Sequence, residues 1–187
     1  EQAADLNEKG GHPERAAVNW ANFVQRYPEP VGPAIEARQK LADFAALSRD
    51  AAGRKHWLEA IIAADASAGS GRTDRTRYLA AWASLELATP ARDAFYAIQL
   101  SAPLKKSLAA KKSAMEAAVK AYTTTADYAV AEVTTAATFE LAELYRRLGK
   151  DILESEGPPG LDPDALEQYV TLLGEQAYPF GEKAVEV

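Results

Sequence analysis

The sequence contains no cysteine, and its 187 residues include only two histidines and one methionine. Without cysteine, neither a disulfide nor a thiolate metal site can form. The redox compartment stays open, because helical proteins of the cytosol and of the periplasm can both lack cysteine. Neither histidine, His12 or His56, is followed four residues later by a histidine or a glutamate that would complete a metal-binding helical face. We therefore expect no metal site, and we interpret both histidines as structural or solvent-exposed.

Recognisable catalytic machinery is also missing. There is no cysteine nucleophile and no Gly-x-Ser-x-Gly turn. The glycine-rich run Ser67–Arg72 lacks the Lys-Ser/Thr ending of a phosphate-binding loop, and we interpret it as a flexible connector. Glutamates such as Glu140 and Glu143 have the chemistry of an acid and base pair, but a solvated helix face is the simpler interpretation in a chain with 27 acidic residues. The sequence predicts a protein that is not an enzyme, has no catalytic residue and holds no cofactor.

The charge and the hydrophobic pattern exclude two classes of partner. A net charge of −6 and a pI near 5.1 argue against nucleic-acid binding, which needs a basic surface. No apolar run approaches the roughly 20 residues that span a bilayer, so we expect no direct membrane insertion. What remains is a protein or peptide partner.

Strand signals are scarce, and alanine, a strong helix former, is the most frequent residue. With 48% hydrophobic residues the chain can bury a sizeable core. Proline and glycine divide the sequence into successive amphipathic segments. We predict an all-α fold with helices over the ranges 13–26, 33–51, 91–100 and 128–154. Four further helices are expected: one that contains Trp57–Ile62 and ends at the loop from Ser67, one from about 74 until Pro90, one from Pro103 through Tyr122, and one from Pro163 through Leu173. A short helix ends before Gly10, and another starts at Pro179.

Two segments resemble opposite halves of a tetratricopeptide-repeat (TPR) unit, a pair of antiparallel helices. The second-helix pattern of turn glycine, small residue, two aromatics and closing proline matches Gly11, Ala16, Trp20, Phe23 and Pro28. The first-helix pattern of large, small and aromatic residues with a turn glycine matches Leu141, Ala142, Tyr145 and Gly149. We therefore predict a TPR-like right-handed helical solenoid, in which each unit buries its apolar face against its neighbours.

The spacing of these patterns predicts one solenoid over residues 1–187 with an enlarged centre. We expect shorter helix pairs over 1–102, a long helical hairpin over 103–156 and further repeat helices over 157–187. The chain begins at Glu1 without methionine and ends inside a helical pattern. We expect it to be a piece of a longer repeat protein, and removal of a signal peptide is left open.

The TPR register predicts a partner-binding inner groove. It places Leu141, Ala142 and Tyr145 in the core and turns Phe139, Glu143, Arg146 and Arg147 towards the groove. Guanidinium groups bind carboxylates through paired hydrogen bonds, so this set can hold a peptide. The same register applied to Leu41 turns Gln39 and Asp43 inward. The alternative is that all six are ordinary exposed residues.

A second candidate surface is basic and lies on the helix expected after Pro103. It is formed by Lys105, Lys106, Lys111, Lys112 and Lys120. An acidic partner would dock there, unless the lysines only solubilise an exposed helix face. The three tryptophans, Trp20, Trp57 and Trp82, fall within apolar helical stripes and are predicted to pack in the core.

Several stretches spread over most of the chain resemble one family. They are Trp57–Ile62 with Asp65, Arg72–Ala80, Pro103–Leu108 and Leu166–Phe180. Together they look like long bacterial envelope TPR proteins of the kind described as components of Ton-type energy-transduction systems. The resemblance implies a scaffold in the periplasm or associated with the membrane, while a cytoplasmic location stays open.

These observations favour a non-catalytic protein-interaction scaffold, with the location taken from the resemblance alone. Two alternatives stay open. One is a helical substrate-binding or accessory domain of an enzyme whose catalytic residues lie elsewhere, and the other is a structural spacer in a longer repeat array.

Overall fold

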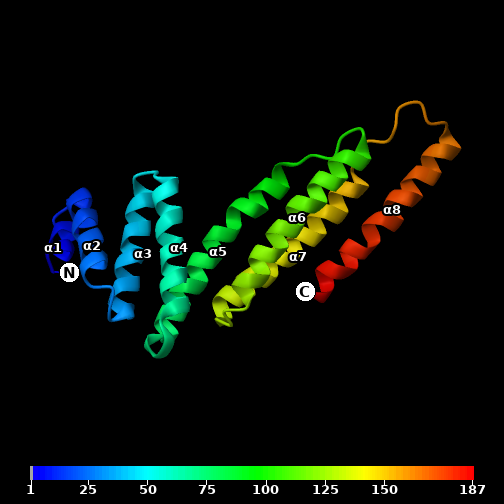
Figure 1. Ribbon diagram of the computed structural model, residues 1–187. Helices are drawn as coiled ribbons and strands as arrows, with labels where there is room; N and C mark the ends of the chain where they lie inside the picture. The colour runs from blue at the N-terminus through cyan, green and yellow to red at the C-terminus, as the bar shows by residue number, and fades with distance from the viewer. Residues whose placement is uncertain (1) are drawn as a thin grey trace. The chain divides into compact units, whose positions relative to one another are not determined.

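The computed structural model describes residues 2–187, and in this range every regular element is a helix (Figure 1). The finding confirms the all-α prediction. The α-helices are α1 (Gln2–Lys9), α2 (Pro13–Arg26), α3 (Val31–Leu47), α4 (Ala51–Ser67), α5 (Asp74–Ala97), α6 (Leu104–Ala126), α7 (Ala131–Leu153) and α8 (Pro163–Glu186). A short 3-10 helix, η1 (Gly69–Gly71), joins α4 to α5.

The chain forms two compact units, and the boundary between them falls within α5. The first unit ends at Leu87, and the second runs from Ala88 to Val187. In the first unit, α1 packs on α2, α2 on α3 and α3 on α4. In the second unit, α7 packs against both α6 and α8. Within the range 103–156, for which the sequence predicted a long hairpin, α6 and α7 have 23 residues each and pack against each other.

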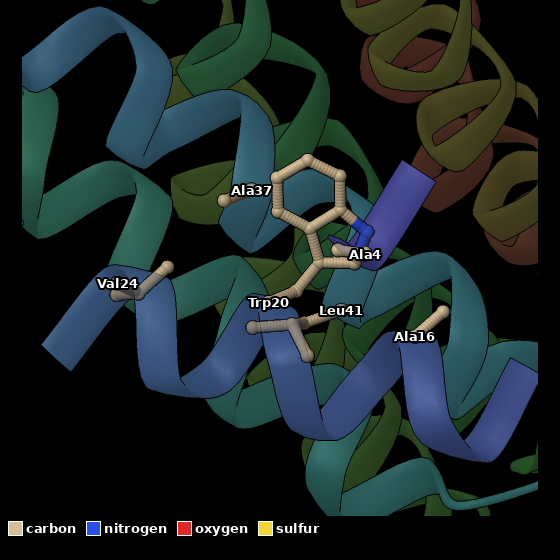
Figure 2. Packing of buried hydrophobic residues seen from close by; sticks show 6 residues of the cluster. All are labelled: Ala4, Ala16, Trp20, Val24, Ala37 and Leu41. Atoms are coloured by element: carbon tan, nitrogen blue, oxygen red, sulfur yellow. The ribbon is translucent and has the colours of Figure 1, made fainter. Parts of the chain in front are cut away.

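Trp20 occupies the centre of the hydrophobic cluster in the first unit (Figure 2). On α2, Ala16, Trp20 and Val24 recur every four residues, so their side chains lie on one helix face. Trp20 keeps only 6% of its surface exposed, which confirms it as a core residue. The other cluster members come from α1 and α3, namely Ala4, Ala37 and Leu41. Trp57 and Trp82 are half-buried.

The connector between α4 and α5 is closed by a buried carboxylate. Asp65, 1% exposed, accepts hydrogen bonds from Arg72 Nε at 2.9 Å and from Thr76 Oγ1 at 2.8 Å. Thr73 and Thr76 also exchange backbone-to-hydroxyl hydrogen bonds of 2.9 and 3.1 Å, which satisfy free N–H groups at the start of α5. Between these two helices, Gly69–Gly71 form a 3-10 turn within the segment that the sequence predicted as a connector.

Two prolines lie inside helices, where the sequence predicted helix boundaries. Pro90 lies within α5 and Pro179 within α8. A proline removes one backbone hydrogen bond from a helix at a cost of about 3 kcal/mol. Packing on both sides offsets this cost in α5, where Ala88 and Phe95 are buried. In α8, Ala177 is buried just before the proline. The predicted boundaries at Pro90 and Pro179 are wrong.

The core face of α7 also differs from the TPR register. Leu141, Ala142 and Tyr145 are only half-buried. A longer series at spacings of four and seven residues is buried in their place, and it consists of Val133, Ala137, Leu144, Leu148 and Ile152. Because this series extends over the whole helix, it determines which face of α7 turns inward.

The burial of Trp20 predicts a large loss of stability when its side chain is removed. Trp20→Ala should lower the free energy of unfolding by about 3 to 5 kcal/mol, because it removes buried apolar area and leaves a cavity. Val18, which is 61% exposed on the same helix, provides the control, and Val18→Ala should have little effect. Urea denaturation measures both values. Equal values for the two variants would contradict the packing.

Candidate protein-binding groove

The four groove residues predicted on α7 share one helix face but have different environments. Phe139 is 63% exposed. Arg146 and Glu143 form a two-point ion pair, with Arg146 Nε 2.7 Å from Glu143 Oε1. This hydrogen bonding lowers the pKa of the Glu143 carboxyl. Arg147 binds Asp151 at 2.8 Å and lies 5.7 Å from the centre of the Tyr96 ring. Among the four, only Arg146 lines the groove described below.

Gln39 and Asp43 lie on α3 in the first unit and contact each other. The Gln39 amide donates a 3.0 Å hydrogen bond to the Asp43 carboxylate. A hollow of about 390 Å³ near them is lined by other residues of α2, α3 and α4, among them Leu41, Phe44 and Trp57. Neither Gln39 nor Asp43 lines this hollow.

Lys111 was predicted on a basic surface, and the structure contradicts this. Its side chain is 1% exposed, and Nζ lies 2.6 Å from Asp151 Oδ2. Nζ also donates a 2.5 Å hydrogen bond to the carbonyl of Ile98, just after the end of α5, and lies 4.6 Å from the centre of the Phe95 ring. An ammonium group at the carboxyl end of a helix interacts favourably with the helix dipole. Lys111 therefore joins α5, α6 and α7.

The other four lysines remain nearer the surface, but they do not form one uniform patch. Lys105, Lys106 and Lys120 are exposed. Lys112 is half-buried, and its Nζ lies 5.4 Å from the centre of the Phe180 ring of α8. With Lys111 buried and Lys112 against α8, the basic surface is smaller than the sequence predicted.

The end of α5 and the middle of α7 are joined by charged side chains. Arg92 Nη1 lies 2.8 Å from Glu140 Oε1, so this glutamate is part of a structural ion pair. Tyr96 lies in the same region, and burial raises the pKa of its hydroxyl, with a further rise from Glu140 and Glu143. These groups hold the end of α5 and the middle of α7 together.

A groove of about 780 Å³ lies between α7 and α8. Small residues keep it open. Gly149 of α7 is buried where the helices touch, and a Cβ there would lie 3.5 Å from the Ala177 carbonyl oxygen. A Cβ at Gly174 or Gly181 of α8 would meet no atom within 4 Å, so both positions face open space.

Large apolar side chains around this groove are exposed to solvent. Among the lining residues, Leu153 is 56% exposed, Tyr178 66% and Val185 89%. The apolar face continues along α8 through Leu166 and Val170, which are 49% and 57% exposed. A continuous apolar surface of this kind is typical of an interaction site.

The rim of the groove carries opposite charges on its two walls. Arg146 and Lys150 line it from α7 together with Glu154 at the end of that wall, and Glu182 and Glu186 line it from α8. The ion pairs that these side chains form run along their own helices: Arg146 with Glu143, Lys150 with Glu154 at 3.7 Å, and Glu186 with Lys183 at 3.0 Å. Tyr178 donates a 2.8 Å hydrogen bond to Glu182, which raises the pKa of the tyrosine hydroxyl.

The sequence reasoning missed the α8 side of this groove because it expected a new helix at Pro179. A signal was present in the spacing. Apolar residues and glycines follow one another at intervals of three or four residues, in the series Leu166, Val170, Gly174, Tyr178, Gly181 and Val185. Such a series defines one helix face.

Two further findings concern residues 2–187. No three or more of their histidine, aspartate and glutamate side chains come together in a way that could hold a metal ion. No helix formed by these residues combines the length and the apolar character needed to cross a bilayer. Comparisons with protein-family models, with curated proteins and with solved structures find no match to this chain.

The buried ion pair predicts that Asp151 is important for stability. Asp151→Ala should lower the free energy of unfolding by about 3 to 5 kcal/mol, because it leaves the Lys111 ammonium buried without its carboxylate. Asp93→Ala is the matched control, since Asp93 pairs with Arg92 but is largely exposed, and it should cost less than about 1 kcal/mol. Urea denaturation compares the two, and similar losses would contradict the role given to Lys111.

The open space at Gly181 predicts a gain of stability on adding a methyl group. Gly181→Ala should stabilise α8 by about 0.5 to 1 kcal/mol, because alanine loses less backbone entropy in a helix and meets no neighbour. Gly149→Leu should instead destabilise the protein by about 1 to 3 kcal/mol, because the side chain would push α8 away from α7. If Gly181→Ala destabilises the protein, the groove is not open at this position.

Proposed function

We propose that this protein is a non-catalytic protein-interaction scaffold and that the groove between α7 and α8 is its binding surface. The observation that carries the proposal is the exposure of Leu153, Tyr178 and Val185 around a groove of about 780 Å³. Covering apolar surface is worth about 25 cal/mol per Å², so a partner that fills the groove gains binding energy from these side chains.

The charged groups near the groove support a binding role rather than a catalytic one. Asp151 pairs with both Lys111 and Arg147, and Glu140 pairs with Arg92. These groups are used in joining helices. The groove itself presents mainly apolar side chains with charges at the rim, which is the usual arrangement of a protein-binding surface.

The TPR-like solenoid and the envelope location belong to this proposal as well. Antiparallel neighbours such as α6 and α7 provide the type of helix pair from which a solenoid is built. The location follows from the sequence resemblance to bacterial envelope TPR proteins. Of the two arginines that the TPR register assigned to an inner groove, Arg146 is included in the binding surface proposed here. Arg147 instead binds Asp151 and lies near the Tyr96 ring.

Photo-crosslinking tests this function. A photoreactive phenylalanine at position 178 should form an adduct with a specific protein in the cells that produce this chain, because the side chain projects at the groove. The same group at Thr123, an exposed residue of α6, is the control. The adduct should disappear when Gly174→Phe and Gly181→Phe fill the groove. The purified partner should then bind the parent chain and not the filled variant.

Three results would contradict the proposal. The first is an absence of any adduct from position 178. The second is an equal yield from positions 178 and 123, and the third is an adduct that persists in the filled variant. A circular dichroism spectrum and a melting curve of the filled variant show whether the helices remain intact.

A further inference from the structure

We infer that the partner segment in the α7–α8 groove is an amphipathic α-helix with an apolar stripe, an acidic flank and a basic flank. The inference rests on the proposed function, since it specifies which protein segment the same groove accepts. The contacts on the two walls and the floor of the groove carry it.

The apolar lining of the groove favours a bound segment whose backbone hydrogen bonds are already formed within the segment itself. Both walls are helices, so most of their backbone N–H and C=O groups, apart from those at Pro179 and in the last turns, are already paired within α7 and α8. An extended peptide would place its backbone polar groups against apolar side chains with nothing to bind. A helix has no such cost, and helices commonly bind in apolar grooves of this type.

The dimensions of the groove also suit a helix. The lining residues on α8 extend from Gly174 to Glu186, which corresponds to about 18 Å of helix at 1.5 Å per residue. This length accepts about three turns of a partner helix. Gly174 leaves a hollow one turn before Tyr178, and Gly181 leaves another between Tyr178 and Val185, so the side chains of a packed helix can insert beside these larger residues.

The charges on the rim specify the flanks of the partner helix. Arg146 and Lys150 on the α7 wall favour acidic residues beside them. Glu182 and Glu186 on the α8 wall favour basic residues. The present ion pairs of these side chains are exposed and lie along one helix, so they are weak and can be exchanged for pairs with the partner. Glu154, the present partner of Lys150 at the end of the α7 wall, is exposed and returns to solvent when Lys150 pairs with the partner helix.

The opposite walls also determine the direction of the bound helix. Turning a helix end for end within the groove exchanges its two flanks. A helix with one acidic and one basic flank therefore matches the rim in one direction and faces like charges in the other, which is unfavourable. Exchange of the flanks in the peptide should reverse the direction of binding.

The test uses synthetic 18-residue helical peptides with the same leucine stripe and different flanks. The probe peptide has glutamate on one flank and lysine on the other. Two comparison peptides have glutamate on both flanks or lysine on both. Fluorescence anisotropy with the full chain should show that the mixed peptide binds about tenfold or more tightly than either comparison peptide. Equal affinity for the three would overturn the assignment of the flanks.

Charge-reversal variants of the protein provide a second test of the charge match between the rim and the peptide. Arg146→Glu with Lys150→Glu, or Glu182→Lys with Glu186→Lys, should each weaken the mixed peptide about tenfold, because one wall then repels its flank. Lys106→Glu with Lys120→Glu, two exposed lysines of α6 that do not line this groove, should leave the affinity unchanged. A loss of affinity in this control and not at the groove walls would place the peptide on the basic surface and overturn the inference.

The direction can be measured because the chain has no cysteine of its own. Glu156→Cys, in the loop after α7, provides a single labelling position near one end of the groove. Energy transfer from the peptide amino terminus to this label should change from high to low, or from low to high, when the flanks of the peptide are exchanged. The same transfer for both peptides would contradict a direction determined by the rim.

The outcomes separate this inference from the proposed function. If the mixed peptide does not bind while the groove-dependent crosslink to a protein persists, the scaffold function stands and the mixed-flank helix is wrong. If neither is observed, both are wrong. If ultracentrifugation shows a dimer of the parent chain that Gly181→Phe abolishes, the occupant is a second copy of this chain, and the inference of a separate partner helix is overturned.

Discussion

Helix α8 is packed on one side and open on the other, and the functional interpretation depends on this imbalance. Its neighbour α7 packs against both α6 and α8 and buries a series of residues along its whole length. In α8, only Leu173 and Ala177 are buried. Leu166, Val170, Tyr178 and Val185 therefore remain exposed along the rest of the helix. The free energy still available from covering these side chains makes this face the strongest candidate for binding.

The position of α7 is maintained by charged contacts on the side away from the groove. Asp151 binds both Lys111 and Arg147, and Lys111 reaches the carbonyl of Ile98 after the end of α5. The two residues that flank Asp151 in the sequence, Lys150 and Ile152, lie in different environments. Lys150 lines the groove, while Ile152 is buried in the core. One turn of α7 thus combines an internal ion pair with a rim charge.

The sequence predicts the all-α character well, because helix content follows from local periodicity. Prediction from the sequence is less reliable where contacts between distant residues compete with local helix signals. Pro90 and Pro179 favour helix ends locally, but packing around Ala88, Phe95 and Ala177 keeps both helices continuous. In the sequence, Lys111 resembles the other lysines of the same helix. Its burial depends on Asp151, which approaches from α7 and cannot be identified from the local pattern. For the same reason the sequence identified Arg146 and not the α8 wall.

Hydrogen exchange of the full chain, with and without the mixed-flank helical peptide, tests the central claim most directly. Amide exchange reports local opening of each helix. The account predicts that the peptide slows exchange over 146–154 of α7 and 170–186 of α8 and leaves the core of α2 and α3 unchanged. Protection confined to α6 or to the first unit, with none over α7 and α8, would contradict the claim that this groove is the binding surface.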